Sequence, residues 1–104
     1  MQVVLTVETL PAEPLAASAQ FQANHLAEAE RMLADEGTGA LAICLPPGGT
    51  DHDDWRRTLA RDLARSRAPK RVNVIGGTGG AACEEALAYL ADAPGITGQY
   101  IPLS

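Results

Sequence analysis

The chain has 104 residues, of which 46% are hydrophobic and 20% are charged, and this is enough for one compact domain. A formal net charge of -5 and an aromatic content of 4% argue against nucleic-acid binding, which needs positive charge for the phosphates and aromatic rings for the bases. No apolar run reaches the roughly 18 residues of a membrane span, and no charged leader precedes the first strand. We therefore expect a cytoplasmic protein without a membrane segment.

Strand and helix patterns alternate along the chain. Apolar and β-branched runs predict strands at residues 2–8, 40–45, 72–75 and 99–103. Helical spacing predicts helices at residues 15–34 and 51–66, and a third helix that opens at Glu84 and Glu85 and closes at Pro94. Strands joined by helices pair in parallel through crossover connections. The predicted fold is α/β, a small Rossmann-like four-stranded parallel sheet with about three helices.

The handedness of these connections has a consequence for the surface of the sheet. Right-handed crossovers between strands in sequential order place every helix on the same face. The strands nevertheless read as near-continuous apolar runs, with Thr6 and Asn73 as polar interruptions, which is typical of strands covered on both faces. Helices on one face alone would leave an apolar face bare, which is an aggregation hazard. We therefore expect this face to be covered by a second copy, by another protein, or by the third helix crossing over.

Several polar residues are candidates for chemistry. The cluster Asp51, His52, Asp53 and Asp54 contains metal-ligating residue types, but consecutive residues at a helix start point in different directions, so helix capping is favoured and no metal site is predicted. His25 is expected to be a solvated residue in the middle of a helix. Cys44 and Cys83 are expected to be reduced packing residues, because free cysteine is commonly buried.

A basic series accompanies the second helix. Within it, Arg57, Arg61 and Arg65 recur every four residues along one helix face. The acidic residues Asp53, Asp54 and Asp62 lie close to the basic series in sequence. A solvated flank is favoured over an anion site or an acidic-partner site. The series is Arg56, Arg57, Arg61, Arg65, Arg67, Lys70 and Arg71.

The glycines after the third predicted strand match G-x-G-x-x-A between a strand and a helix, the pattern of a dinucleotide loop. Under this alternative, Gly77, Thr78, Gly79 and Gly80 would bind a nucleotide or NAD(P). The pattern lacks an acidic residue at the end of the next strand, and Glu84 and Glu85, expected in the first helical turn, would repel a pyrophosphate. A tight strand-to-helix turn is the favoured interpretation, without a cofactor.

Three segments are similar to the short-chain dehydrogenase/reductase (SDR) family. Residues 58–80, TLARDLARSRAPKRVNVIGGTGG, resemble that family's late helix and sixth strand, and residues 84–103, with ITGQ, resemble its closing helix and seventh strand. Residues 31–46, RMLADEGTGALAICLP, resemble its fifth strand and the preceding helix end. The resemblance covers nearly the whole of this chain, but it corresponds to only the second half of the family's domain. Residues 1–104 are therefore expected to form a single truncated SDR-like domain.

The resemblance also implies what this domain lacks. The family's cofactor loop has no counterpart, and its catalytic tyrosine and lysine fall on Leu45 and Gly49. The tyrosines of the chain are Tyr89 and Tyr100, and its lysine is Lys70. Proton transfer to a carbonyl needs a phenol activated by a nearby ammonium. No catalytic residue is therefore predicted.

In the family, the helices that match residues 15–34 and 51–66 pack against a neighbour as a four-helix bundle, and the last helix and strand form a second interface. The resemblance therefore implies a non-catalytic oligomeric or accessory protein. Its expected partners are further copies, in a homodimer or higher oligomer, or a full-length SDR-type reductase. The alternative is a small NAD(P)-binding module or a residual oxidoreductase that uses the Gly77–Gly80 loop.

Overall fold

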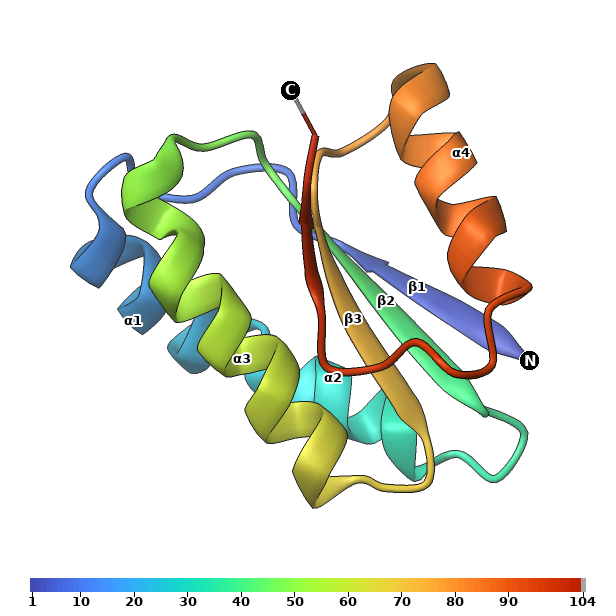
Figure 1. Cartoon of the computed structure of the whole chain (residues 1–104). Coiled ribbons are helices and arrows are strands. Elements are labelled where there is room, and N and C mark those ends of the chain that lie inside the picture. The colour runs from blue at the N-terminus through green and yellow to red at the C-terminus, as the bar shows by residue number, and fades with distance from the viewer. Residues whose placement is uncertain (104) are drawn as a thin grey trace.

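The computed structural model describes residues 1–103. Four strands and four α-helices alternate, and a short 3-10 helix, η1, precedes the third α-helix (Figure 1). In chain order the elements are β1 (Gln2–Thr6), α1 (Pro14–Asn24), α2 (Leu26–Ala34), β2 (Ala40–Leu45), η1 (Thr50–His52), α3 (Asp53–Ser66), β3 (Arg71–Gly76), α4 (Gly80–Ala91) and β4 (Tyr100–Pro102).

The strands form one parallel sheet in the order β1-β2-β3-β4. Ala42 at the centre of β2 pairs with Val4 of β1 and with Asn73 of β3, and Val74 pairs with Tyr100 of β4. This arrangement confirms the predicted small Rossmann-like four-stranded parallel sheet. Because all strands run the same way, their carboxyl ends share one edge of the sheet, where ligand sites of open α/β sheets lie.

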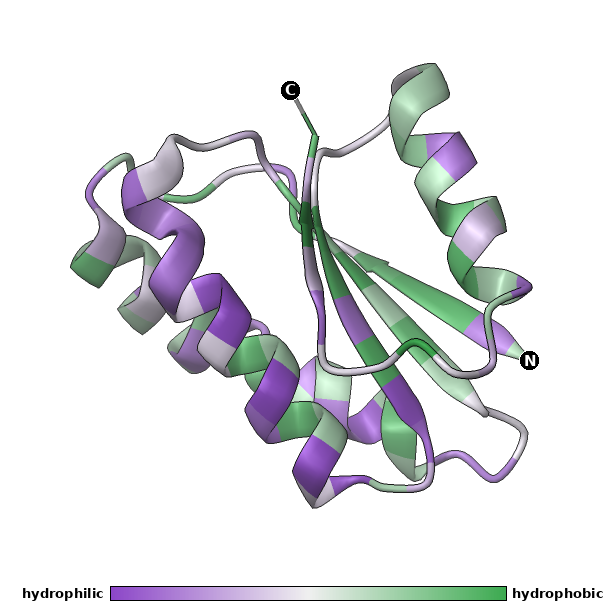
Figure 2. Cartoon of the chain, in the orientation of Figure 1, coloured by the Kyte–Doolittle hydropathy of each residue, from purple (hydrophilic) through white to green (hydrophobic). Residues whose placement is uncertain are grey.

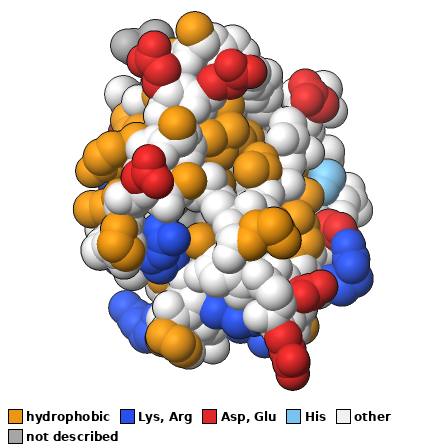
Figure 3. Space-filling view, turned by 90° about the vertical axis from the view of Figure 1, so that its right-hand side faces the viewer, with side chains coloured by type: hydrophobic (Ala, Val, Ile, Leu, Met, Phe, Trp, Pro, Cys, Tyr) orange, Lys and Arg blue, Asp and Glu red, His pale blue; other side chains and the backbone are white. Residues whose placement is uncertain are grey.

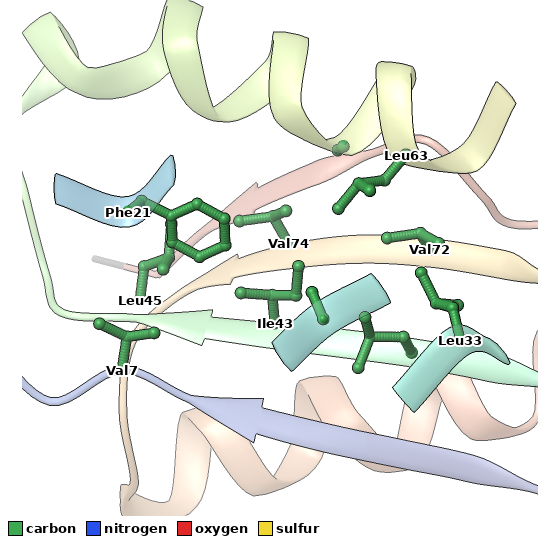
Figure 4. Packing of buried hydrophobic residues seen from close by; sticks show 11 residues of the cluster. Val7, Phe21, Leu33, Ile43, Leu45, Leu63, Val72 and Val74 are labelled. Carbon is green, nitrogen blue, oxygen red and sulfur yellow. The ribbon is translucent and has the colours of Figure 1, made fainter. Parts of the chain in front are cut away.

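Helices α1, α2 and α3 cover one face of the sheet. Leu41, Ile43 and Leu45 of β2 alternate toward this face and pack against Phe21 of α1 and Leu63 of α3 (Figure 4). These side chains are at most 6% exposed, so this is the main core. Figure 2 shows hydrophobic residues along the sheet and hydrophilic residues along much of α3.

Helix α4, the third predicted helix, covers the opposite face, which confirms one of the three expected covers, and the central strands therefore have no bare apolar face. Ala42 and Cys44 of β2 and Ile75 of β3 pack there against Cys83 and Leu90 of α4. Figure 1 shows α4 on the other side of the sheet from α1, α2 and α3. Because the strand order is sequential, the β3-α4-β4 connection must have the opposite hand to the two connections before it. This change of hand explains why β2 and β3 have hydrophobic residues on both faces of the sheet.

The cover provided by α4 leaves β1 partly exposed. Val4, on the α4 side of β1, is 39% exposed, and Tyr89 on the outer side of α4 is 58% exposed. Figure 3 shows hydrophobic side chains gathered on the face of the molecule that lies to the right in Figure 1, with acidic side chains scattered among them. Within residues 1–103 no helix is both long and apolar enough to cross a membrane.

Several predicted boundaries differ from the structure. The helix expected at 15–34 is two helices that meet at His25, whose backbone (φ -127, ψ -22) is not helical and whose ring lies 5.8 Å from the Phe21 ring. His25 is therefore a half-buried junction residue and not a solvated one inside a helix. Helix α4 begins at Gly80, so Glu84 and Glu85 lie beyond its first turn. The argument that they repel a phosphate there does not hold.

Candidate functional site

A cavity of about 350 Å³ lies at the carboxyl edge of the sheet, where ligands of open parallel sheets bind. Its walls are the loop that follows β1, the loop that follows β2, and the beginning of the helical segment η1-α3. The lining includes Leu10, Pro11, Pro46, Pro47, His52 and Arg56. Leucine and proline side chains give this wall apolar surface, polar surface makes up about half of the lining, and Asp51, His52 and Arg56 are among its polar side chains.

Arg56 is buried, which corrects its predicted place on a solvated flank. Its side chain is 1% exposed and is among the largest fully buried side chains of the described chain. The guanidinium donates from Nη2 to the carbonyl oxygen of Pro46 (2.8 Å) and from Nη1 to the hydroxyl oxygen of Tyr100 (3.1 Å). It therefore ties α3 to the β2 loop and to β4. The burial of Arg56 could have been inferred from helical spacing, because Arg56, Ala60 and Leu63 lie on one face of α3 and form its buried stripe.

The buried guanidinium has no ionic partner among residues 1–103. No carboxylate of these residues lies within 4.0 Å of it, and Arg56 Nε has no hydrogen-bond acceptor. The rings of Trp55 and Tyr100 lie 5.5 and 5.6 Å from the guanidinium carbon, which gives two cation–π contacts. A buried cation without a counter-ion costs several kcal/mol in desolvation. The cavity wall thus contains a buried positive charge that no carboxylate of the described residues contacts, with the exposed Asp51 elsewhere in the lining.

His52 lies beside this cation and is held in one tautomer. Its side chain is 5% exposed, its Nε2 lies 3.0 Å from the carbonyl oxygen of Ala12, and Trp55 Nε1 donates to its Nδ1 at 3.0 Å. Because Nδ1 accepts, the proton of the neutral ring is on Nε2, which donates to Ala12. His52 therefore connects the β1 loop to α3 and is not a capping side chain.

The acidic neighbours of His52 also form neither side-chain caps nor a metal site. Asp53 and Asp54 pair with Arg57 at 3.7 and 3.9 Å, and no side chain caps η1 or α3. In the described part of the chain, no group of three or more His, Cys, Asp or Glu side chains is placed to hold a metal ion. The favoured capping interpretation is wrong because Gly49 and His52 occupy the cap positions.

The glycine loop has structural reasons for its composition. A Cβ at Gly76 would collide with the hydroxyl of Tyr100, and one at Gly77 would lie 2.8 Å from Leu103 Cδ1. Gly79 and Gly80 have φ values of 110° and 83°, a region that favours glycine. Thr78, between Gly77 and Gly79, is half-buried. Turn geometry and packing account for these residues, and nucleotide binding at Gly77–Gly80 stays a prediction.

The positions that match the family's catalytic pair carry no proton donor. Leu45 is fully buried at the end of β2, and Gly49 is the cap of η1. Lys70 lies at the amino end of β3, where its Nζ binds the carbonyl oxygens of Leu33 and Asp35. The Tyr100 hydroxyl lies at the opposite end of that strand, over Gly76. The lysine therefore cannot activate this phenol.

Cys44 and Cys83 are free and buried, as predicted for packing residues. Their sulfur atoms lie 3.8 Å apart between β2 and α4, and Cys83 Sγ lies 3.5 Å from the carbonyl oxygen of Gly77. Burial, with a smaller contribution from the contact with Cys83, raises the pKa of the Cys44 thiol to about 12. A thiol that stays protonated is a poor nucleophile.

A second hollow, of about 650 Å³, runs between α1-α2 and α3 on the outer side of the helical layer. We call it the helical groove. Phe21, Leu26, Trp55, Leu59 and Leu63 supply its apolar lining. Its polar lining residues include Gln22, Glu30, Asp54 and Asp62. From the sequence, the helices predicted at residues 15–34 and 51–66 were expected to pack against a neighbouring molecule. The sequence did not indicate a groove between them.

The parallel sheet, the crossover helices and the ligand-type cavity at the carboxyl edge define a Rossmann-like α/β domain. A family model described as SDR-like, short chain dehydrogenase-like protein, matches residues 5–103. The chain therefore belongs to the SDR-like family, as its motifs predicted. Searches of curated proteins and of solved structures found no match.

Proposed function

We infer that this SDR-like domain is non-catalytic and acts by association, pairing with a second copy of itself through the helical groove. The main support is the groove, whose apolar lining includes Trp55, Leu59 and Leu26, all only partly buried. Aromatic and aliphatic side chains that are partly exposed in a concave surface are typical anchors of protein interfaces. The apolar strands no longer support association by themselves, because α4 covers the central ones.

The charges on the outer face of α3 favour a second copy as the partner. When two copies of a helix pack antiparallel about a two-fold axis, residues equally far from the helix middle face each other. Such an axis between Leu59 and Ala60 sets Asp54 opposite Arg65 and Asp62 opposite Arg57. These four side chains are exposed on α3. The face is therefore complementary to itself in charge.

The salt bridges that these residues make within one chain are weak competitors. Arg57 reaches Asp54 at 3.9 Å and Arg65 reaches Asp62 at 3.9 Å, with exposed side chains in both pairs. Exposed pairs of this kind contribute about 0–1 kcal/mol. Replacing these salt bridges by salt bridges between two copies should therefore cost little free energy. Pairing of two copies over the groove would also remove apolar surface from water, which favours the dimer.

The chemistry of the domain supports a non-catalytic role. Leu45 and Gly49 replace the family's proton donor and its lysine, and Lys70 and Tyr100 lie at opposite ends of β3. The hydrogen bond between buried Arg56 and half-buried Tyr100 joins a phenol to a permanently charged guanidinium, which cannot relay a proton.

A charge exchange on α3 tests the proposal. We expect the wild type to sediment as a dimer, Arg65→Asp to shift it toward monomer because Asp54 of one copy then meets a carboxylate, and Asp54→Arg combined with Arg65→Asp to restore the dimer. The control Arg31→Asp makes the same charge change on α2, outside the groove. A monomeric wild type, or a dimer indifferent to Arg65→Asp, contradicts the proposal.

One observation favours the alternative of a small NAD(P)-binding module. No side chain caps α4, and no atom lies within 4 Å of the Cβ positions of Gly79 and Gly80, so this helix start is open to a phosphate. NADH or NADPH should then raise the melting temperature by mass action. Such a rise, together with a monomeric wild type, would favour the alternative. A heterodimer formed with an added SDR-type reductase would instead make that enzyme the partner.

A further inference from the structure

We propose that the cavity at the carboxyl edge of the sheet binds a small monocarboxylate, whose carboxylate group is held by the guanidinium of Arg56. This proposal is independent of the association through the helical groove, which lies on the outer side of the helices. It rests on the charge of Arg56, which no carboxylate of residues 1–103 contacts, on its free hydrogen-bond donors, and on the apolar part of the cavity wall.

The charge of Arg56 is the first argument. The side chain is 1% exposed, lines the cavity, and has no carboxylate within 4.0 Å among residues 1–103. Arginine stays protonated in proteins, so burial cannot neutralise it. Two cation–π contacts and two hydrogen bonds to neutral oxygens compensate the desolvation only in part. A bound anion would supply the missing counter-charge.

The hydrogen bonds of Arg56 are the second argument. A guanidinium has five N–H donors, and the protein uses one on Nη1 and one on Nη2. Arg56 Nε is buried and without an acceptor among the described residues. A carboxylate matches the planar donor geometry of arginine and accepts two parallel hydrogen bonds. The contacts to Pro46 and Tyr100 hold the guanidinium in place for such a ligand.

The other residues that line the cavity indicate which chemical class of ligand it would bind. Among the described residues, Arg56 is the one arginine or lysine in the lining, and Asp51 adds a negative charge at the same cavity, so a singly charged ligand is favoured over a dianionic phosphate. Leu10, Pro11 and Pro46 offer apolar surface to a short hydrocarbon body. A volume of about 350 Å³ is sufficient for such a molecule.

Gly48 marks the approach to the guanidinium. A Cβ at this position would lie 3.2 Å from Arg56 Nη2 and 3.1 Å from His52 Cδ2. These distances are tight for a side chain, so alanine would crowd the space between the loop and the cation. Substitution of Gly48 should therefore reduce binding without removing the charge.

Nuclear magnetic resonance titration of the full chain tests the proposal, with sodium butyrate as the probe. We expect butyrate to shift the Nε–H signal of Arg56 and the indole N–H signal of Trp55 along a saturating curve, and neutral butyramide to leave them unchanged. Inorganic phosphate in a separate titration distinguishes the class of anion. No saturable shift with butyrate at tens of millimolar overturns the proposal, as does a shift by phosphate alone.

Matched variants locate the site. Arg56→Met should weaken butyrate binding about tenfold or more because a charge-assisted hydrogen-bond pair is lost. Arg61→Met removes the same charge from an exposed position of α3 and should leave the affinity unchanged. Unchanged binding by a folded Arg56→Met protein overturns the proposal. If that variant fails to fold, Gly48→Ala decides: lower affinity in a folded protein supports the site, and unchanged affinity overturns it.

Discussion

Cys44 lies at the contact between the sheet and α4, with its sulfur 3.8 Å from that of Cys83. The side chain is 1% exposed, so ionisation would place a thiolate in an apolar layer. Burial therefore raises the pKa of Cys44 from 9.0 to about 12. In the unfolded chain the same thiol regains its ordinary pKa, and the difference couples folding to pH.

The pH dependence of stability follows from this difference. Between about pH 9 and pH 12 the unfolded chain loses the Cys44 proton while the folded chain retains it, so the free energy of unfolding falls as pH rises. The expected slope is about 1.4 kcal/mol per pH unit within that window. Below it this thiol adds no slope. Urea unfolding at a series of pH values measures the effect.

The control for this prediction is Cys44→Ala, which removes the titrating group and should flatten the alkaline slope by the same amount. The wild-type thiol should also react slowly with a disulfide reagent at neutral pH, because it is protonated and buried. An equal alkaline slope in the wild type and Cys44→Ala would show that Cys44 does not cause it.

At the scale of elements, α4 is the unusual feature, because it lies alone on its face of the sheet. It is held there by Leu90 and Cys83 against Ile75, and by Arg71, whose Nη1 donates to the carbonyl oxygens of Leu90 and Ala93 at 2.9 and 3.1 Å. The contact of Cys83 lies near the start of the helix, and those of Leu90 and Arg71 lie near its end, so the orientation of α4 across β2 and β3 is fixed at both ends.

Leu90→Ala tests the cover that α4 provides. Leu90 is fully buried, so truncation should lower the free energy of unfolding by about 2–5 kcal/mol through lost burial and a cavity. The matched control is Leu15→Ala on α1, where the side chain is 79% exposed and the expected change is within about 0.5 kcal/mol. Denaturant unfolding measures both. Equal effects of the two variants would mean that α4 does not pack on the sheet.

For the whole molecule, the covered sheet changes the reason to expect association. The central strands are shielded on both faces, so exposed apolar strands do not force the chain to find a partner. What remains open is the helical groove and β1 at the edge of the sheet, where Val4 is 39% exposed. The proposed association through the groove would therefore depend on particular side chains on α3, and substitutions there should remove it without unfolding the domain.

Thermal unfolding gives a measurement of association at this scale. If folding and pairing are coupled, the melting temperature of the wild type should rise with protein concentration by mass action. The variant Arg65→Asp should lose this dependence while keeping the fold, since Arg65 is exposed. A melting temperature of the wild type that is independent of concentration would speak against a dimer that dissociates on unfolding.

The sequence by itself determined the order of elements, the parallel sheet and the family. The buried run at residues 40–45 gave the central strand with its observed ends, and the ITGQ motif at residues 96–99 gave the resemblance. These features are local, because a strand or a family motif is specified by residues that are neighbours in the chain. The turn at Gly79 and Gly80 was also found, although the helix begins there and not at Glu84.

Only the tertiary structure decided which face of the sheet α4 covers and what surrounds Arg56. Both faces of β2 and β3 are apolar, so hydrophobic pattern could not choose between the faces, and the hand of the last connection is not encoded locally. Trp55 and Arg56 differ by about 100° around α3. A helix rotated by that angle would bury Trp55 in place of Arg56, and the observed rotation is set by packing against Tyr100, which is distant in sequence, and against the loop after β2.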